Sequence, residues 1–173
     1  GPLPRMAPPL APVVAAEIRR HGVEVLDGRS VEDITPAGEA LRVTGPDLDL
    51  TGEMVLAAVG IRPNSRLGAD AGLRSEVAGA LAVDARQRTS DPHIYAAGDC
   101  ADAFHVVTGK RVWIPLALRA NRAGWAVADG VCGKDGRLPG VVGSAVFKVF
   151  DMQVARTGLT LEEAREAGFR SRN

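Results

Sequence analysis

The stretch that decides the fold is Thr89-Ser90-Asp91-Pro92-His93-Ile94-Tyr95-Ala96-Ala97-Gly98-Asp99, in a chain of 173 residues. Its small and apolar second half predicts a strand that delivers a glycine and then an aspartate at its carboxyl end. Ligands of open α/β sheets bind outside the carboxyl ends of the strands. Gly98 would allow a ligand to approach the backbone, and Asp99 would accept hydrogen bonds from sugar or polyol hydroxyls. A helix-capping role for Asp99 is the alternative, and the residues alone leave both open.

A second apolar run precedes this stretch. Residues 54–59 are apolar throughout and end at Gly60, which predicts a strand buried on both faces, as in a parallel sheet. We expect a further strand over 80–83 and helices over 64–71 and 116–131. This alternation of strands and helices predicts an α/β fold.

The flanking segments give weaker signals. The first 53 residues predict a helix over 8–21, a strand over 23–26, a hairpin of 31–34 with 41–44 around Pro36-Ala37-Gly38, and a strand over 48–50. Pro139-Gly140 marks a linker, after which residues 143–157 predict strand, turn and strand around Asp151. Thr160 and Glu163 form a capping box that opens a last helix, and Gly168 closes it.

Composition narrows the function classes. Lys+Arg and Asp+Glu are 21 each, so the net charge is zero, which argues against a general binder of nucleic acid or of membrane surfaces. The two cysteines exclude a disulfide scaffold and a four-cysteine zinc site. No apolar run reaches the roughly 18 residues of a membrane span, and no secretory leader is seen. We therefore expect a cytoplasmic protein.

Four segments, in order, resemble the FAD-dependent pyridine nucleotide–disulfide oxidoreductases, and most closely the branch of CoA-disulfide reductases and NADH oxidases. Residues 89–99 are similar to the second flavin-binding motif of that family at every motif position. Residues 59–64 resemble the crossover from the NAD(P)H domain back to the FAD domain. Residues 113–124 resemble the helix whose amino end faces the flavin, and residues 143–158 resemble the first strands of the dimerisation domain.

This resemblance implies a FAD/NAD(P)-binding Rossmann-like three-layer α/β fold that continues into the start of an α+β dimerisation domain. It implies FAD and NAD(P)H as cofactors, a small-molecule disulfide or oxygen as substrate, and a homodimer. Asp99 would contact the ribityl chain of FAD, and Gly60 would lie near the nicotinamide cofactor. The implied cofactor-binding residues are Gly98, Asp99, Pro115, Leu116, Ala117 and Gly60.

The chain departs from the family in two ways. Neither Gly-x-Gly-x-x-Gly turn of the family is present, and the segment that carries its redox cysteine is missing. We therefore expect an internal fragment that is inactive alone and has no catalytic residue of its own. Residues 1–58 would close the NAD(P)H-binding domain, 59–138 would form the second FAD segment, and 139–173 would begin the dimerisation domain. The residues Ala117-Leu118-Arg119 also replace the usual small-residue pattern of the flavin helix.

For the remaining candidate site residues we favour structural or solvated roles. We expect Cys100 and Cys132 to be buried structural thiols. The three histidines are scattered, so no metal site is expected. Arg119 and Arg122 would be able to meet a phosphate, but a solvated helix face is the favoured interpretation. The rival to an oxidoreductase is a non-catalytic α/β binding or assembly module that keeps the scaffold without a cofactor.

Overall fold

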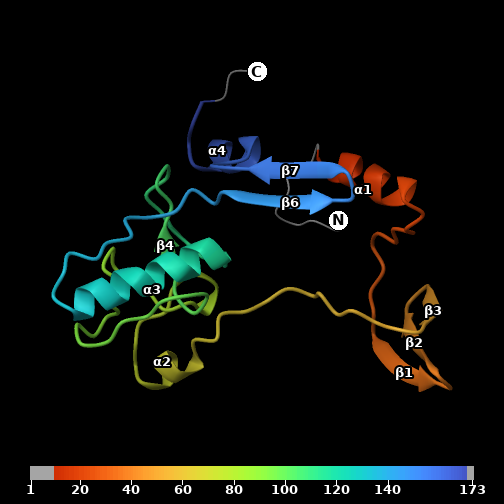
Figure 1. The fold of residues 1–173 in the computed structure, drawn as a ribbon, viewed down its shortest axis with the longest axis horizontal. Coiled ribbons are helices and arrows are strands. Elements are labelled where there is room, and N and C mark those ends of the chain that lie inside the picture. Colours follow the sequence, from red (N-terminus) through yellow and green to blue (C-terminus); the bar gives the residue numbers. More distant parts are fainter. Residues whose placement is uncertain (1–9, 171–173) are drawn as a thin grey trace. The chain divides into compact units, whose positions relative to one another are not determined.

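The computed structural model describes residues 10–170 of the chain. Within them the backbone forms two compact units, drawn in Figure 1. One unit runs to Gly60 and includes Lys148–Gln153, and the other comprises Ile61–Phe147 and the chain from Val154 onward.

The first unit opens with helix α1 (Ala11–Arg20). A proline lies in its first turn, where the missing N–H is not needed. Arg19 and Arg20 occupy the last turn, where positive charge favours the helix dipole. Gly22 ends the helix with a φ of 76°, as expected for a left-handed C-terminal stop. The predicted helix is thus confirmed, while its expected start at residues 8 and 9 lies outside the described residues.

An antiparallel three-stranded sheet follows, in the order β1 (Asp33–Ala37), β2 (Ala40–Gly45) and β3 (Leu48–Gly52). The predicted hairpin and third strand are therefore confirmed. Pairing of Ala37 with Ala40 places the first turn at Gly38 and Glu39, slightly later than expected. Residues 23–26, predicted as a strand, are irregular, because no described strand lies beside them to pair with.

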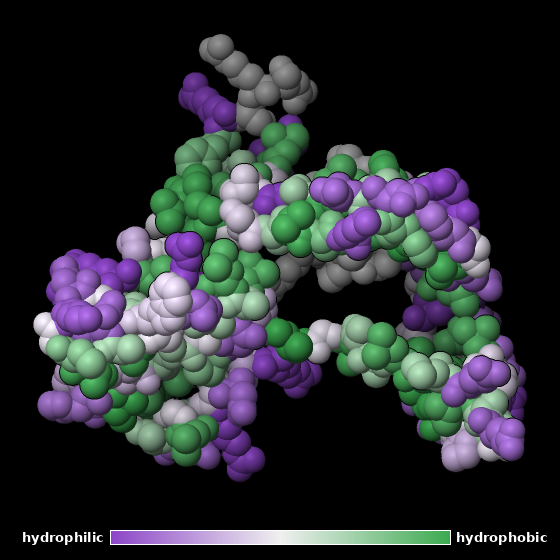
Figure 2. All heavy atoms as spheres, viewed as in Figure 1, coloured by the Kyte–Doolittle hydropathy of each residue, from purple (hydrophilic) through white to green (hydrophobic). Residues whose placement is uncertain are grey.

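The predicted buried strand over 54–59 is wrong. The segment is extended and unpaired, and the side chain of Val59 is 96% exposed. It is the long trace without arrows in Figure 1, and its apolar atoms face outward in Figure 2. A strand is buried only when neighbours supply hydrogen bonds and covering side chains. No described strand pairs with this segment.

The second unit has its core around residues 80–83 and 96–101. Leu81, Val83, Ala96 and Ala101 are buried together, and Leu73 and Cys100 pack against them. The two segments are joined in parallel, because Leu81 donates to the carbonyl of Cys100 at 2.8 Å and Asp102 donates to that of Leu81 at 3.0 Å. Both segments form isolated bridges rather than the regular strands expected from the sequence.

Residues 93–97 were predicted to form a buried strand, but only the end of this run is extended and buried. A turn held by Thr89 and Asp91 occupies its beginning. The Asp91 carboxylate accepts from the His93 N–H at 2.8 Å, and the Thr89 hydroxyl donates to the Asp91 carbonyl at 3.0 Å. Only Tyr95 forms a bridge, to Arg88, and burial begins at Ala96.

The other elements of this unit are short, apart from one helix. Helix α2 (Arg66–Asp70) and helix α3 (Ala117–Val131) confirm the two predicted helices. A 3-10 turn, η1, covers Val77–Gly79, and the small strands β4 (Ala103–Phe104) and β5 (Arg111–Val112) pair in antiparallel fashion. None of the helices in residues 10–170 is long and apolar enough to cross a membrane.

The C-terminal elements match their predictions. Strands β6 (Ala145–Val149) and β7 (Met152–Arg156) form a hairpin around Asp151, with arrows in opposite directions in Figure 1. Helix α4 (Leu161–Glu166) begins with the predicted capping box: the Thr160 hydroxyl accepts from the Glu163 N–H, and the Glu163 carboxylate accepts from the Thr160 N–H.

Candidate flavin-binding loop and helix

The loop that follows the buried Ala96 presents Gly98 and Asp99. Gly98 has a φ of 91°, a conformation that favours glycine, and a Cβ built there would meet no atom within 4 Å. The Asp99 side chain is exposed. Its backbone carbonyl accepts a hydrogen bond from Trp113 Nε1 at 2.8 Å. The backbone of the loop is thereby anchored, while the Asp99 carboxylate faces solvent.

The amino end of α3 lies beside this loop. Leu116 is extended, with φ −134° and ψ 132°, and the helix begins at Ala117. None of the described side chains caps the helix, and its first turn carries no acidic residue. The first N–H groups of a helix have no intrahelical partner, and they form the positive end of its dipole. This end of α3 therefore suits a group that carries or develops negative charge.

Arg119 joins α3 to the loop. Its side chain is only 6% exposed, and its guanidinium donates to the carbonyls of Gly98 at 2.7 Å, Ala101 at 3.0 Å and Asp102. Burial lowers the pKa of Arg119, and the charges of Asp102 and Asp99 oppose that shift. The prediction of a solvated face is thus wrong for Arg119, although Arg122 is exposed as expected.

A buried ion pair fixes the far end of the loop. Asp102 is fully buried, and its Oδ1 accepts from the Val83 N–H at 3.1 Å and from Arg111 Nη1 at 2.6 Å. Arg111 also lies over the Phe104 ring, 4.5 Å from its centroid. Burial raises the pKa of the Asp102 carboxyl, and the hydrogen bonds from Val83 and Arg111 oppose that shift. The network ties the Asp102 end of the loop to Val83 and Arg111.

Residues 1–124 match the family model described as pyridine nucleotide-disulphide oxidoreductase. The chain belongs to this family. The match covers more than half of the sequence and includes the anchored loop and the amino end of α3. The resemblance stated from four segments of sequence is confirmed, and so is the α/β fold of the FAD/NAD(P)-binding type.

Two similar proteins and one solved structure show where the likeness extends. A NAD(P)H coenzyme A polysulfide/persulfide reductase of Pyrococcus horikoshii is 42% identical over 117 residues, which are 68% of this chain and 26% of that protein. An NADH oxidase of Streptococcus pyogenes is 34% identical over 160 residues, 92% of this chain and 35% of that protein. The structure of a NAD-dependent persulfide reductase from A. fulgidus superposes with a TM-score of 0.82 at 37% identity, over 91% of this chain and 29% of that chain.

The chain thus spans between a quarter and about a third of the length of these relatives. Five of the six cofactor-binding residues expected from the family resemblance lie in the second unit. The structure brings Gly98 and Asp99 close to the segment Pro115–Ala117 through the contacts of Trp113 and Arg119. Gly60 belongs to the first unit, where it has a φ of 95° at the end of the exposed segment.

Sequence reasoning did not predict the burial of two residues of this candidate site, Arg119 and Asp102, although a signal existed for Arg119. Arg119, Ala123 and Ala126 are the buried residues of α3, and their spacing of four and three places them on one face. The helical period would have assigned Arg119 to that face. Nothing in the sequence marks Asp102 as buried, because its burial depends on Val83 and Arg111, which are distant along the chain.

The two cysteines are both free. Cys100 is half-buried, and its thiol donates to the carbonyl of Ala97 at 3.3 Å, which is compatible with a structural role. Cys132 is exposed, so the prediction of a buried thiol is wrong there. It follows α3 directly as the C-terminal cap residue, where the helix leaves the core.

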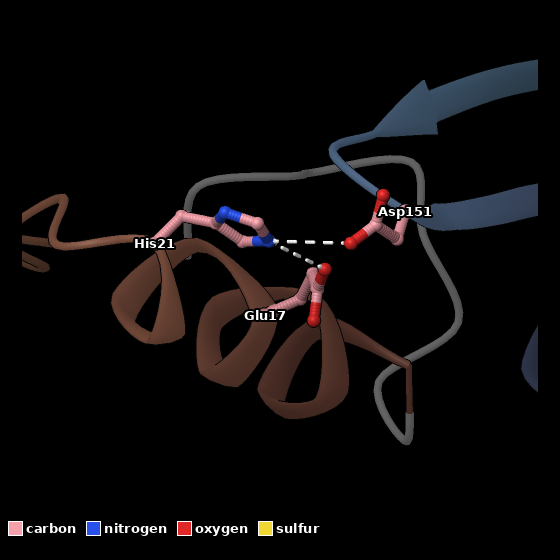
Figure 3. A group of neighbouring side chains, drawn as sticks. All are labelled: Glu17, His21 and Asp151. Carbon is pink, nitrogen blue, oxygen red and sulfur yellow. Dashed lines mark hydrogen bonds and ion pairs between the residues drawn. The ribbon is translucent and has the colours of Figure 1, made fainter.

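A polar cluster in the first unit joins α1 to the β6–β7 turn (Figure 3). One ligand atom each of Glu17, His21 and Asp151 lies within 4.8 Å of the others, a grouping that the prediction of no metal site missed. Glu17 precedes His21 by four residues on α1, which was the available signal. Arg20 donates to Glu17 through Nε and Nη2 at 2.9 Å each, and to Asp151 at 3.4 Å. Its guanidinium pairs with both carboxylates, so we assign the cluster to an ion-pair network.

Proposed function

We propose that this chain is a segment of a flavoprotein oxidoreductase that moves electrons from NAD(P)H through FAD to a small-molecule disulfide or to oxygen. The names of the relatives support this reaction class, since they are reductases of polysulfide or persulfide and an NADH oxidase. The share of their length that this chain covers supports its being one segment of a longer enzyme.

The observation that carries the proposal is the joining of the Gly98–Asp102 loop to the amino end of α3. Arg119 and Trp113 connect the two elements through carbonyl groups, which leaves the Asp99 carboxylate exposed. A carboxylate that serves a ligand hydroxyl needs this exposure, whereas a helix-capping aspartate would bond to backbone N–H groups. No described N–H is bonded to the Asp99 carboxylate, which favours the ligand role.

The residues present fit FAD. Asp99 would accept hydrogen bonds from ribityl hydroxyls, and Gly98 would allow close approach of the backbone. Pro115, Leu116 and Ala117 would place the uncapped N–H groups of α3 where negative charge develops on the reduced flavin. When bound, FAD supplies the chemistry of electron transfer, and the protein positions and tunes it. Gly60 would lie near the nicotinamide cofactor.

The division of the chain into segments stays part of the proposal. Residues 1–58 would close the NAD(P)H-binding domain, 59–138 would supply the second FAD segment, and 139–173 would begin a dimerisation domain. We further propose a homodimer in the reducing cytoplasm. Apolar side chains on the β6–β7 hairpin support association, since Val146, Phe147 and Phe150 are all exposed.

Flavin content tests the function. A longer protein that contains residues 1–173 together with both phosphate-binding turns is expected to purify yellow, with flavin absorbance near one FAD per chain, and to oxidise NADH or NADPH. A colourless protein that gains no flavin when FAD is added would favour the non-catalytic module instead. The 173-residue chain alone is expected to bind FAD weakly or not at all, because a half-site cannot order the pyrophosphate.

Light scattering tests the assembly. At high concentration the 173-residue chain is expected to form dimers or larger species through its apolar hairpin. Phe147→Ser on that hairpin should reduce the association, whereas a change at the exposed Arg122 on α3 should not. A wild-type chain that stays monomeric would contradict the homodimer proposal and leave the flavin proposal to its own test.

A further inference from the structure

Arg119 is buried although its side chain is charged. It lies in the first turn of α3, and its side chain is only 6% exposed. The planar guanidinium donates to three backbone carbonyls of the same loop, at Gly98, Ala101 and Asp102. Three carbonyl groups of one short loop thus converge on this guanidinium and bind it specifically.

We propose that Arg119 is a positioning residue that clamps the Gly98–Asp102 loop to α3 and so sets the place of Asp99 relative to the amino end of that helix. This inference rests on the proposed flavin function. Both elements would contact the same cofactor, one through a carboxylate and the other through N–H groups. A side chain that fixes their separation therefore governs the affinity of the site without touching the ligand.

The chemistry of the clamp explains why arginine suits this place. Five N–H donors in a rigid plane reach several carbonyls at once, which a lysine ammonium on a flexible stem does less well. The guanidinium stays charged when buried, and the carbonyl dipoles replace part of its lost hydration. The carboxylates of Asp102 and Asp99 add favourable charge, although neither accepts a direct hydrogen bond from it in residues 10–170.

Other contacts leave the loop little freedom besides the clamp. The Asp99 carbonyl accepts from Trp113, and the Asp102 carboxylate is held by Val83 and Arg111. The carbonyls at 98, 99, 101 and 102 thus all accept from side chains. Arg119 supplies three of these four contacts, so its loss should release the Gly98 end of the loop more than the Asp102 end.

The test replaces Arg119 with Met, which keeps an unbranched apolar stem but removes every donor, and with Lys, which keeps the charge. Arg122→Met, one turn further along the same helix and exposed, is the matched control. Amide hydrogen exchange at Ala101, whose N–H is bonded to the Gly98 carbonyl, reports on the loop in the 173-residue chain. FAD affinity is measured in the longer flavoprotein.

We expect R119M to speed exchange at Ala101 by about tenfold or more and to weaken FAD binding by about tenfold, with R119K retaining only part of the affinity because its ammonium reaches fewer carbonyls. R122M should change neither. Unchanged exchange in R119M would overturn the clamp. Faster exchange with unchanged FAD affinity would also overturn the proposal, because the role would then be structural only.

Two further outcomes are decided in the same experiment. If R119M does not fold, R119Q, which keeps one amide donor without the charge, carries the same comparison with R122M. A wild-type longer protein that takes up no FAD would overturn the proposed function and with it the flavin role of Arg119. Exchange at Ala101 that still responds to R119M would then show that the ligand assignment failed and the clamp did not.

Discussion

Two apolar runs of this chain end in a glycine with positive φ, yet one is exposed and the other leads into a buried core. Residues 54–59, before Gly60, are unpaired, with Val59 96% exposed. The run before Gly98 leads into the core of the second unit, where Ala96 is 7% exposed and Ala101 is fully buried. By composition alone, the first run is the more continuously apolar.

The difference lies in neighbours rather than in the runs themselves. Ala96 donates to the carbonyl of Gln87, and residues 80–83 lie alongside Cys100–Asp102 through backbone hydrogen bonds. The run at 54–59 has no such neighbour among the described residues. Apolar continuity therefore predicts that a segment requires burial, while long-range partners decide whether it is buried.

The largest expected loss of stability comes from the buried Asp102–Arg111 ion pair. Asp102→Ala leaves the Val83 N–H without its acceptor in a closed site and removes the carboxylate partner of Arg111 Nη1, which keeps only the Val83 carbonyl. Breaking a buried pair from one side costs about 3 kcal/mol or more of unfolding free energy. Urea unfolding followed by tryptophan fluorescence measures it, because both tryptophans, Trp113 and Trp125, lie in the second unit.

The control for this change is Asp70→Ala on the surface of α2. Its carboxylate is 68% exposed and faces Arg66 at 3.5 Å. An exposed pair of this kind should change stability by less than about 0.5 kcal/mol. Equal losses in the two variants would show that the Asp102 network does not hold the loop.

The second expected effect is on FAD binding by Asp99 in the anchored loop. Asp99→Ala in the longer flavoprotein should lower FAD affinity roughly tenfold to a hundredfold or somewhat more, since a hydrogen bond to a charged acceptor contributes about 1.5–3 kcal/mol. The melting temperature of the flavin-free protein should shift little, because the side chain is exposed. Titration of apoprotein with FAD gives the first quantity and calorimetry the second. Unfolding of the apoprotein with normal FAD affinity would instead make Asp99 a structural cap.

The exposed run 54–59 and the buried core segment 80–83 can be compared with one matched pair of variants. Val83→Ala removes two methyl groups from a site that is 2% exposed and should cost about 2 kcal/mol. Val59→Ala makes the same chemical change at a site that is 96% exposed and should stay within about 0.5 kcal/mol. Urea unfolding followed by circular dichroism covers both units. A comparable loss at Val59 would mean that the segment 54–59 is covered in solution.

Most of the elements that the sequence predicted correctly were recognised from local signals. Capping, proline and glycine positions and alternation located α1, the β1–β2–β3 sheet, α3, the β6–β7 hairpin and α4, because each depends on residues close together in the chain. The errors fall on 23–26, 54–59, 80–83 and 93–97, all short runs that were assigned as strands. Strand formation needs partners that local sequence does not reveal.

The candidate site was predictable to a similar depth. The Gly98–Asp99 pair and the start of α3 came from a motif that specifies a backbone shape. Arg119 was misjudged, because a charged residue on a helix is normally solvated, and only the helical period of Ala123 and Ala126 argued otherwise. Asp102 was not singled out, since its pairing with Arg111 becomes visible only in three dimensions.

The smallest effect expected belongs to the first unit, where the Glu17 side chain is 9% exposed but its partners Arg20 and Asp151 are 61% and 80% exposed. The hydrogen bond and charge of Arg20 hold the pKa of Glu17 near 2, against an ordinary value of 4.5, although desolvation opposes them and His21 adds a further hydrogen bond. A depressed carboxyl pKa stabilises the fold above the unfolded value and loses that contribution as the pH falls through the folded one. The contact of α1 with the β6–β7 turn should therefore weaken between about pH 4.5 and pH 2.

The stack of His21 on Phe150, with ring centroids 3.9 Å apart and planes 9° from parallel, provides the readout. Its ring-current shift, followed by NMR, should decline over that acid range in the wild type. Glu17→Gln should show the weakened stack already at neutral pH and lose the dependence on acid, whereas Glu24→Gln, at an exposed position beyond the helix, should behave as the wild type. Burial raises the pKa of the Asp102 carboxyl, so its effect on stability has the opposite pH dependence to that of Glu17. Its contribution is fully present below the pKa of the unfolded chain and is lost as the pH rises through the folded value. A stack that persists unchanged to pH 2 in the wild type would show that Phe150, and not the ion pairs, holds the turn against α1.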